Sequence, residues 1–86
     1  MPTISMFYGI MIRMFYSDHA PPHFHALYGE HEALIEIGSL AVIGGDLPRR
    51  ALHLTLKWAR SHRGELLEDW ELCRAMRVPK PIAPLE

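Results

Sequence analysis

The stretch HFHALYGEHEALIEI, residues 23–37, predicts a β-hairpin whose register decides which side chains share a face of the sheet. Two short runs of strand-forming residues flank Gly29-Glu30, and a Gly-X pair is typical of a two-residue type II′ turn. Because side chains alternate along a strand, this turn sends the mostly apolar cross-strand pairs to the face that the helices are expected to cover. The pairs expected on that face are Tyr28 with His31, Ala26 with Ala33, and Phe24 with Ile35.

The opposite face of this hairpin is expected to hold two imidazoles and two carboxylates. His23 and His25 lie two residues apart, so their Cα atoms would be about 6.6 Å apart on one side of the sheet. On the facing strand, Glu36 would lie opposite His23, Leu34 opposite His25 and Glu32 opposite Leu27. A slip of one residue in the turn would reverse the two faces.

Two imidazoles at this spacing can bind one zinc-like ion, with Glu36, Asp18 or His19 as a third ligand. An open fourth position would then hold water, and the ion could be zinc, manganese or nickel. Without a metal, His25 and Asp18 are candidates for acid–base catalysis. The spacing alone favours a third interpretation, in which the histidines form a structural or partner-binding polar face, because His-x-His pairs are common and no second metal motif accompanies this one.

The rest of the chain predicts an α+β fold. Further strands are expected at residues 10–16 and 40–43, giving an antiparallel sheet of three to four strands with the hairpin. Asp46 is a plausible N-cap for a first helix, and a second apolar stripe follows the interruption at residues 62–64. The expected core positions on the two helices are Leu47, Ala51, Leu54 and Trp58, then Leu66, Leu67, Trp70 and Cys73. We therefore expect a two-helix hairpin over one face of the sheet, with a single domain at 1–78 and an extended tail at 79–86.

Length and composition limit the class of protein. The chain has 86 residues, is 49% hydrophobic and carries a formal net charge of −1, which suits one small globular domain rather than a general polyanion binder. The lone Cys73 cannot form an internal disulfide, so we expect a reducing, cytoplasmic setting. The apolar segment at residues 1–16 is interrupted by Gly9 and Arg13, so neither a signal peptide nor a membrane span is expected.

Two further surfaces are candidates for partner binding. Met6, Phe7 and Tyr8 are more consecutive apolar residues than one face of a small sheet can bury, so this segment is either an edge strand or a dimer contact. The first helix carries a basic stripe, formed by Arg49, His53, Lys57 and Arg60 with Arg50 alongside. This stripe is either solvated or faces an acidic partner or phosphate. The second helix is acidic, and this counts against DNA. The partner-binding candidates are Met6, Phe7, Tyr8, His23, His25, Arg49 and Arg50, and the partner could also be a second copy of the chain.

Three segments resemble a known bacterial family, the domain of unknown function 4160. They are MPTISMFYGIMI, DHAPPHFHALYGEHEALI and LPRRALHLTLKWARSHRGELLEDWEL, which together span almost the whole chain. Met6 and Ala20 stand where the family commonly has Arg and Asn, so any contact made by those side chains is missing here. The resemblance falls on Phe7, Tyr8, Gly9, Asp18, His19, Pro22, His23, Phe24, His25, Gly29, Leu47, Pro48 and Trp70.

The resemblance implies a context rather than a reaction. Members of the family are small bacterial and phage-associated proteins, often encoded beside another short family, the domain of unknown function 2442. This arrangement is similar to toxin–antitoxin operons, so the resemblance implies that the protein is a protein-binding component of such a pair. On this interpretation we do not expect an enzyme. The alternative is a metal-dependent hydrolase or nuclease that uses His23 and His25. A weaker alternative is a DNA-binding transcription regulator that uses the basic stripe.

Overall fold

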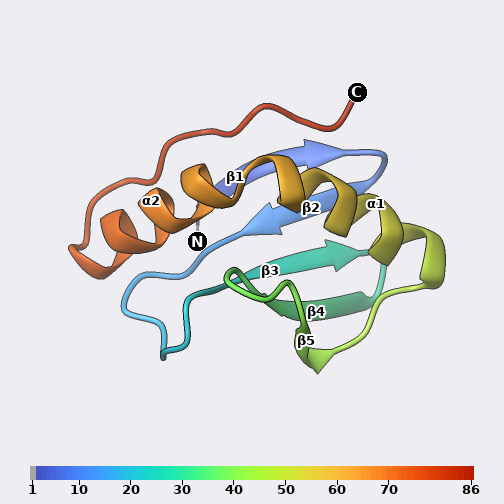
Figure 1. Ribbon diagram of the computed structural model, residues 1–86, viewed down its shortest axis with the longest axis horizontal. Helices are drawn as coiled ribbons and strands as arrows, with labels where there is room; N and C mark the ends of the chain where they lie inside the picture. The colour runs from blue at the N-terminus through green and yellow to red at the C-terminus, as the bar shows by residue number, and fades with distance from the viewer. Residues whose placement is uncertain (1) are drawn as a thin grey trace.

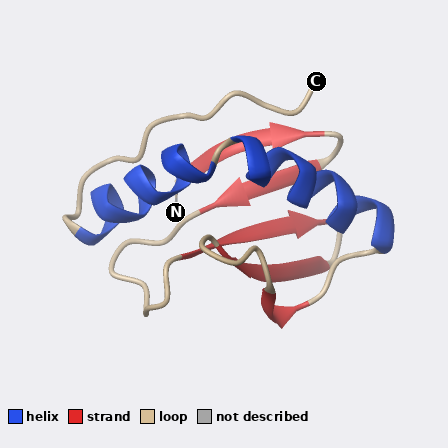
Figure 2. Cartoon of the chain, viewed as in Figure 1, coloured by secondary structure: helices blue, strands red, loops and turns tan. Residues whose placement is uncertain are grey.

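A computed structural model describes residues 2–86; Met1, at which the expected domain begins, lies outside these residues. Five antiparallel strands form one sheet in the order β1-β2-β3-β4-β5, and two helices follow them in the chain (Figures 1 and 2). The α+β class is confirmed, whereas the expectation of three to four strands was too low. The strands are β1 (Thr3–Phe7), β2 (Ile10–Arg13), β3 (His23–Tyr28), β4 (His31–Glu36) and β5 (Val42–Gly45).

The additional strand is the N-terminal segment, which forms the edge strand β1. It pairs with β2 through a tight turn at Tyr8 and Gly9, whose φ values are 49° and 80°. Two consecutive positive φ values are the type I′ pattern, whose twist suits a hairpin. Of the two expectations for this segment, the edge strand is therefore confirmed. The second strand is shorter than expected and ends at Arg13.

The central hairpin has the expected register. Phe24 pairs with Ile35, Ala26 with Ala33, and all four side chains are fully buried. The turn has a positive φ at Gly29, as a type II′ turn requires. The opposite face of β3 therefore presents His23 and His25, as expected.

Strand β5 begins two residues later than expected and ends at Gly45. Gly45 has a φ of 64°, and a Cβ at this position would collide with the backbone carbonyl oxygen of Glu32 in β4. Only glycine combines that backbone conformation with such a close approach of two strands. The β4–β5 pairing therefore depends on this residue.

The helices α1 (Arg49–Ser61) and α2 (Arg63–Arg74) lie end to end across one face of the sheet (Figure 1). The expected two-helix hairpin was wrong, because only His62 separates the helices and a helical hairpin needs a loop of about 2–5 residues. Helix α1 begins later than expected as well. Pro48 occupies the N-cap position with no side-chain hydrogen bond, so Asp46 does not cap the helix.

The core lies between this helical layer and the sheet. Trp58 packs against Phe7 and Phe24, with ring centroids 5.2 and 6.0 Å apart, respectively. On α2, Leu66, Trp70 and Cys73 are buried as expected, but Leu67 is 43% exposed and Asp69 is buried in its place. Positions 66, 69, 70 and 73 lie on one side of a helix, and position 67 is about 100° away from position 66.

The extended segment at residues 79–86 lies against the domain beside β1 (Figure 1). The backbone N–H of Ile82 donates to the carbonyl oxygen of Ile4 at 2.8 Å, and the indole N–H of Trp58 donates to the carbonyl oxygen of Ala83 at 2.8 Å. The side chain of Ile82 is buried. The tail thus covers part of the core. Within residues 2–86, neither helix is long and apolar enough to span a membrane.

Candidate functional site

Three side chains converge at the start of β3. The loop at residues 14–22 brings Asp18 back over the histidine face, and its Oδ2 atom lies 3.0 Å from Nε2 of His23 and 3.1 Å from Nε2 of His25. One ligand atom from each residue lies within 4.8 Å of the other two. The local sequence explains this geometry, because strand alternation aligns the two imidazoles and the prolines at 21–22 end the loop. We refer to Asp18, His23 and His25 as the triad.

The far side of each imidazole is held by an oxygen atom. Nδ1 of His23 lies 2.8 Å from the carbonyl oxygen of Pro21, and Nδ1 of His25 lies 2.9 Å from Oε2 of Glu32. A carbonyl oxygen only accepts hydrogen bonds, so Nδ1 of His23 carries the proton and donates it. The Glu32 carboxylate requires the same of His25. In the neutral tautomer of both rings, the Nε2 lone pair therefore points at the Asp18 carboxylate.

Aromatic side chains wall the triad. The ring of Phe15 meets His25 edge-on with centroids 4.3 Å apart, and Trp70 of α2 lies 5.2 Å from the ring of His23. His23 is 5% exposed, His25 is 9% exposed, and the side chain of Asp18 is 21% exposed. The site is therefore closed around the imidazoles and open to solvent at Asp18.

The environment of Asp18 favours its ionised form. Burial by itself would raise the pKa of this carboxyl, but the hydrogen bond with His25, the backbone N–H of His19 and the charge of nearby imidazoles together lower the pKa below its usual value. The His19 N–H donates to Oδ1 at 2.9 Å, which leaves Oδ2 facing the two rings. Asp18 therefore presents a charged oxygen to the two imidazoles at neutral pH.

The triad fits a metal ion. Zinc bonds of about 2.0–2.1 Å in tetrahedral geometry place ligand atoms about 3.3 Å apart, close to the separations of Oδ2 from the two Nε2 atoms. Nε2 of His23 is buried, and although Oδ2 of Asp18 lies 3.0 Å away, no described residue meets this nitrogen with hydrogen-bond geometry. A buried polar atom without a partner is costly, and a coordinated cation would satisfy it. Metal-binding histidines typically contact an oxygen acceptor through their other ring nitrogen, and both Nδ1 atoms here have such a contact.

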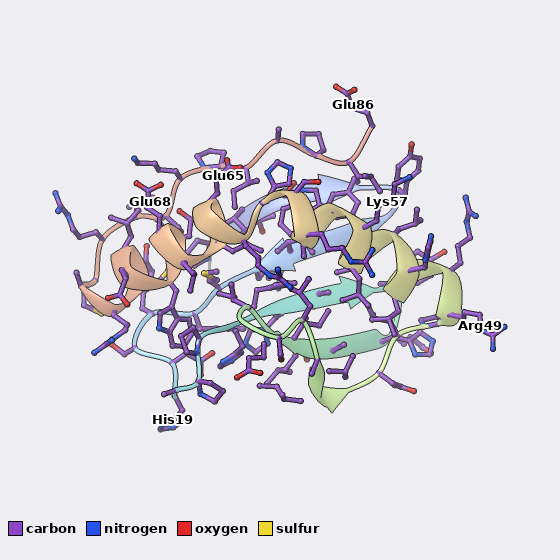
Figure 3. The ribbon with its side chains drawn as sticks, viewed as in Figure 1. His19, Arg49, Lys57, Glu65, Glu68 and Glu86 are labelled. Atoms are coloured by element: carbon purple, nitrogen blue, oxygen red, sulfur yellow. The ribbon has the colours of Figure 1, made fainter. Side chains whose placement is uncertain are left out.

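The structure gathers some of the expected ligands and not others. Asp18, His23 and His25 come together, whereas His19 points away from them at the outer end of its loop (Figure 3). Glu36 instead accepts a hydrogen bond from the hydroxyl of Ser39. Glu36 was expected as a ligand because it pairs with His23, but its carboxylate is held by the turn that follows β4. His19 and Glu36 are therefore outside the triad.

Sequence reasoning missed the role of Glu32. This residue pairs with Leu27, so it is the diagonal neighbour of His25 rather than its direct partner. Diagonal neighbours on a sheet face are within reach of long side chains, and this rule could have identified the contact. The walls formed by Phe15 and Trp70 had no comparable signal, since both depend on tertiary packing.

The candidates for partner binding fall into two groups. Phe7 lies in the core against Trp58, and His23 and His25 are buried, so these three offer little surface to a partner. Arg49, Arg50, Met6 and Tyr8 are exposed, the last two at 60% and 57%. The exposed candidates all lie away from the triad. They include no member of the candidate metal site.

Comparison with known proteins gives a family and no assigned activity. A search of curated proteins and a search of solved structures found no match to this chain. The model of one protein family, described as Domain of unknown function (DUF4160), matches residues 9–71, a span that includes the triad and both helices up to Glu71. Because this match covers most of the 86 residues, the chain belongs to the DUF4160 family.

Proposed function

We propose that this protein binds one divalent metal ion through Oδ2 of Asp18 and the Nε2 atoms of His23 and His25. One observation supports this most directly: three ligand atoms converge while the Nδ1 atom of each ring is held by an oxygen acceptor. Nitrogen and carboxylate ligands suit zinc best, and they also suit manganese and nickel. Glu32 and the Pro21 carbonyl would orient the two imidazoles.

The same geometry without a metal would require extra protons. Each ring already donates from Nδ1, so a hydrogen bond to Asp18 would make both imidazoles cationic and leave two buried charges sharing one carboxylate. Nε2 of His23 lies 3.0 Å from Oδ2 of Asp18, but this contact does not have hydrogen-bond geometry. A single divalent ion would replace both protons. The metal account therefore explains the burial of His23 better than the metal-free account does.

The class of reaction that this site best suits is metal-dependent hydrolysis. A divalent ion held by Asp18, His23 and His25 would supply a water activated near neutral pH. Asp18 is the most exposed member of the triad, so solvent reaches the site on its side. The enclosing rings of Phe15 and Trp70 would limit access from the other sides. A phosphodiester or a peptide bond is the substrate class we would assay first.

The test is the metal content of untagged protein, measured by elemental analysis. We expect near-stoichiometric metal in the wild type and its loss in the double variant His23→Ala, His25→Ala. The matched control is His31→Ala, because His31 lies on the same hairpin but is exposed. Absence of metal in the wild type after incubation with zinc, manganese and nickel would refute the proposal. Equal loss in the His31 control would also refute it.

A second function, binding to a small co-encoded protein in a toxin–antitoxin-like pair, rests on the edges of the sheet. The exposed apolar residues Met6 and Tyr8 lie on and just after β1, and Val42 and Ile43 lie on β5. Exposed apolar edge strands invite another chain to pair. The one cysteine of the chain, Cys73, cannot form an internal disulfide, which fits a reducing compartment such as the cytoplasm. Co-expression with the neighbouring gene product and measurement of a stable complex would test this function.

The basic stripe of α1 is the feature that would support a DNA-binding regulator. DNA retention that falls steeply with salt would be expected of such a regulator. Absence of retention at low salt would remove this third function.

A further inference from the structure

A hollow of about 230 Å³ lies at the opposite end of β3 from the triad. The β1–β2 turn, the last residue of β3 and the first half of α1 form its walls. Its lining includes Tyr8, Tyr28, Pro48, Arg50 and Leu54. The hollow shares no residue with the metal site, so its function is a separate question.

The interior of this hollow is apolar and its mouth is polar. Ile10 and Ala51 are buried beneath it, and Leu54 is half-buried on its helical side. Tyr8 and Tyr28 are 57% and 39% exposed, so both rings present surface at the opening. A large apolar side chain would be enclosed by aliphatic groups and would meet two aromatic rings. Arg50 supplies a cation on the same lining.

Exposed basic residues on α1 extend from this hollow. They are the residues of the basic stripe, namely Arg49, Arg50, His53, Lys57 and Arg60, and together we call them the basic face. Figure 3 shows the labelled Arg49 and Lys57 extending outward from α1. Within residues 2–86, no ion pair involves any member of the basic face. These charges have therefore not been neutralised by the chain itself.

The position of two arginines at the start of α1 is electrostatically unfavourable. The amino-terminal end of a helix has a partial positive charge and is stabilised by acidic groups. Helix α1 begins with Arg49 and Arg50, has no acidic residue in its first turn and has no side-chain cap. A local conflict of this kind is expected where a surface serves binding. A negatively charged partner would relieve it.

We propose that the hollow and the basic face together bind an acidic peptide segment of a partner protein. An apolar side chain of the segment would enter the hollow, and its carboxylates would pair with Arg49 and Arg50. Two observations favour a peptide over a nucleic acid. The inner surface of the hollow is aliphatic, at Ile10, Ala51 and Leu54, and suits an apolar side chain. The chain also has a net charge of −1 with exposed Glu65, Glu68 and Glu71 on α2, which would repel a long polyanion.

Defined probes and heteronuclear NMR of the full chain would test this proposal. The first probe is the acetylated, amidated peptide Glu-Asp-Phe-Glu-Asp. In the second, lysine replaces every acid, and in the third, serine replaces phenylalanine. The fourth is a single-stranded DNA of about twelve nucleotides. Each is titrated to about 1 mM, the weakest range in which a surface contact of this kind is measurable.

We expect the acidic phenylalanine peptide to bind most tightly and to shift the amide signals of the β1–β2 turn and the first half of α1. Arg50→Glu should weaken its binding about tenfold or more, as expected for reversal of an interfacial charge. Tyr8→Ser should weaken it too, since this removes one wall of the hollow. Arg77→Glu is the matched control, because Arg77 is an exposed cation outside the basic face.

Four results would overturn the proposal. They are no shift with the acidic phenylalanine peptide, equal binding of the serine peptide, tighter binding of the DNA, or equal weakening by Arg77→Glu. Retained chemical-shift dispersion in Arg50→Glu would show that the variant is folded. An unfolded Arg50 variant would leave Arg49→Glu, on the same exposed turn, to give the same comparison.

Discussion

The substitution Glu32→Gln tests whether the triad holds a metal, because it changes the outer contact and leaves all three ligands in place. Glu32 lies 2.9 Å from Nδ1 of His25. Glutamine keeps an acceptor oxygen but loses the negative charge that makes the imidazole a stronger ligand. Substitutions of such outer contacts typically weaken metal binding about 10–100-fold, and the retained acceptor places Glu32→Gln at the lower end.

The structure also supplies a matched control for this substitution. Glu36 lies on the same strand and the same sheet face, but its carboxylate contacts the hydroxyl of Ser39 rather than a histidine. Glu36→Gln therefore makes the same chemical change and should leave metal affinity unchanged. The two variants carry the same net charge. A general electrostatic effect of losing one carboxylate would lower both affinities equally.

Thermal unfolding converts this affinity difference into a measurable shift. A metal present at a hundred times its dissociation constant stabilises the folded state by about 2.7 kcal/mol. For a domain of this size, 1 kcal/mol corresponds to about 4–8 °C, so the wild type should gain roughly 10–20 °C over the chelated protein. A tenfold loss of affinity in Glu32→Gln should reduce this gain by about 1.4 kcal/mol, or roughly 5–10 °C.

Each variant is measured both with metal and with a chelator, so that any direct effect on folding cancels. Competition with a chromophoric chelator gives the dissociation constant independently. A metal-dependent shift that is the same in Glu32→Gln and Glu36→Gln would refute the assignment of Glu32. No shift in the wild type with zinc, manganese or nickel would refute the metal site itself.

Three further predictions concern stability. Burial raises the pKa of Asp69 above its value in the unfolded chain, so ionisation of this carboxyl opposes folding as the pH rises above about 4. The free energy of unfolding of Asp69→Asn should therefore increase relative to that of the wild type from pH 4 to pH 7. A difference in urea unfolding that does not change with pH would contradict this. Gly45→Ala should cost more than about 2 kcal/mol because of its positive φ and the collision with β4, whereas Gly38→Ala, with open space around it, should change the midpoint little; equal effects would exclude the steric argument. Deletion of residues 79–86 removes a buried isoleucine and the hydrogen bond from Lys80 N–H to the Asp69 carboxylate, so calorimetry should show a loss of about 2–4 kcal/mol, and an unchanged melting temperature would show that the tail does not stabilise the core.

The central hairpin shows what local sequence determines. Its turn has two residues, so its length fixes the register, and the register places Phe24 in the core and His25 on the other face. Each step uses only neighbours along the chain or directly across a short turn. The pair of histidines in the candidate site could therefore be predicted without knowledge of the tertiary fold.

The position of Asp18, the third member of the triad, depends on the path of a loop rather than on strand alternation. Asp18, His19 and Glu36 are all within reach of the histidine face in sequence terms, and choosing among them requires the path of the loop at residues 14–22. In the structure, the backbone N–H of His19 binds one oxygen of Asp18 and turns the other oxygen toward the rings. The local sequence pattern could predict three candidates for the third ligand, and only the conformation of the folded loop selects Asp18.

The helical layer illustrates a second limit of periodicity. Leu67 was expected in the core because leucine is apolar, whereas Asp69 was not among the expected core positions. Instead, Oδ1 of Asp69 accepts a hydrogen bond from the backbone N–H of Lys80 at 2.8 Å, so the returning tail provides a partner for one oxygen of this buried carboxylate. A helix viewed by itself has no indication of that partner. The tail at residues 79–86 therefore contributes to the burial of Asp69 on the inward side of α2.

The burial of the triad also affects the free energy of folding. A domain of 86 residues buries only about 60–65% of its unfolded surface, so it has little surplus stability with which to offset buried polar groups. His23 nevertheless occupies a position in which one ring nitrogen is enclosed and has no hydrogen bond. Metal coordination offsets such a cost because its binding free energy adds to the free energy of folding. If the site holds an ion, the metal-free chain is the less stable form, and the triad should then contribute to the folding of β3, whose other end lies at the hollow.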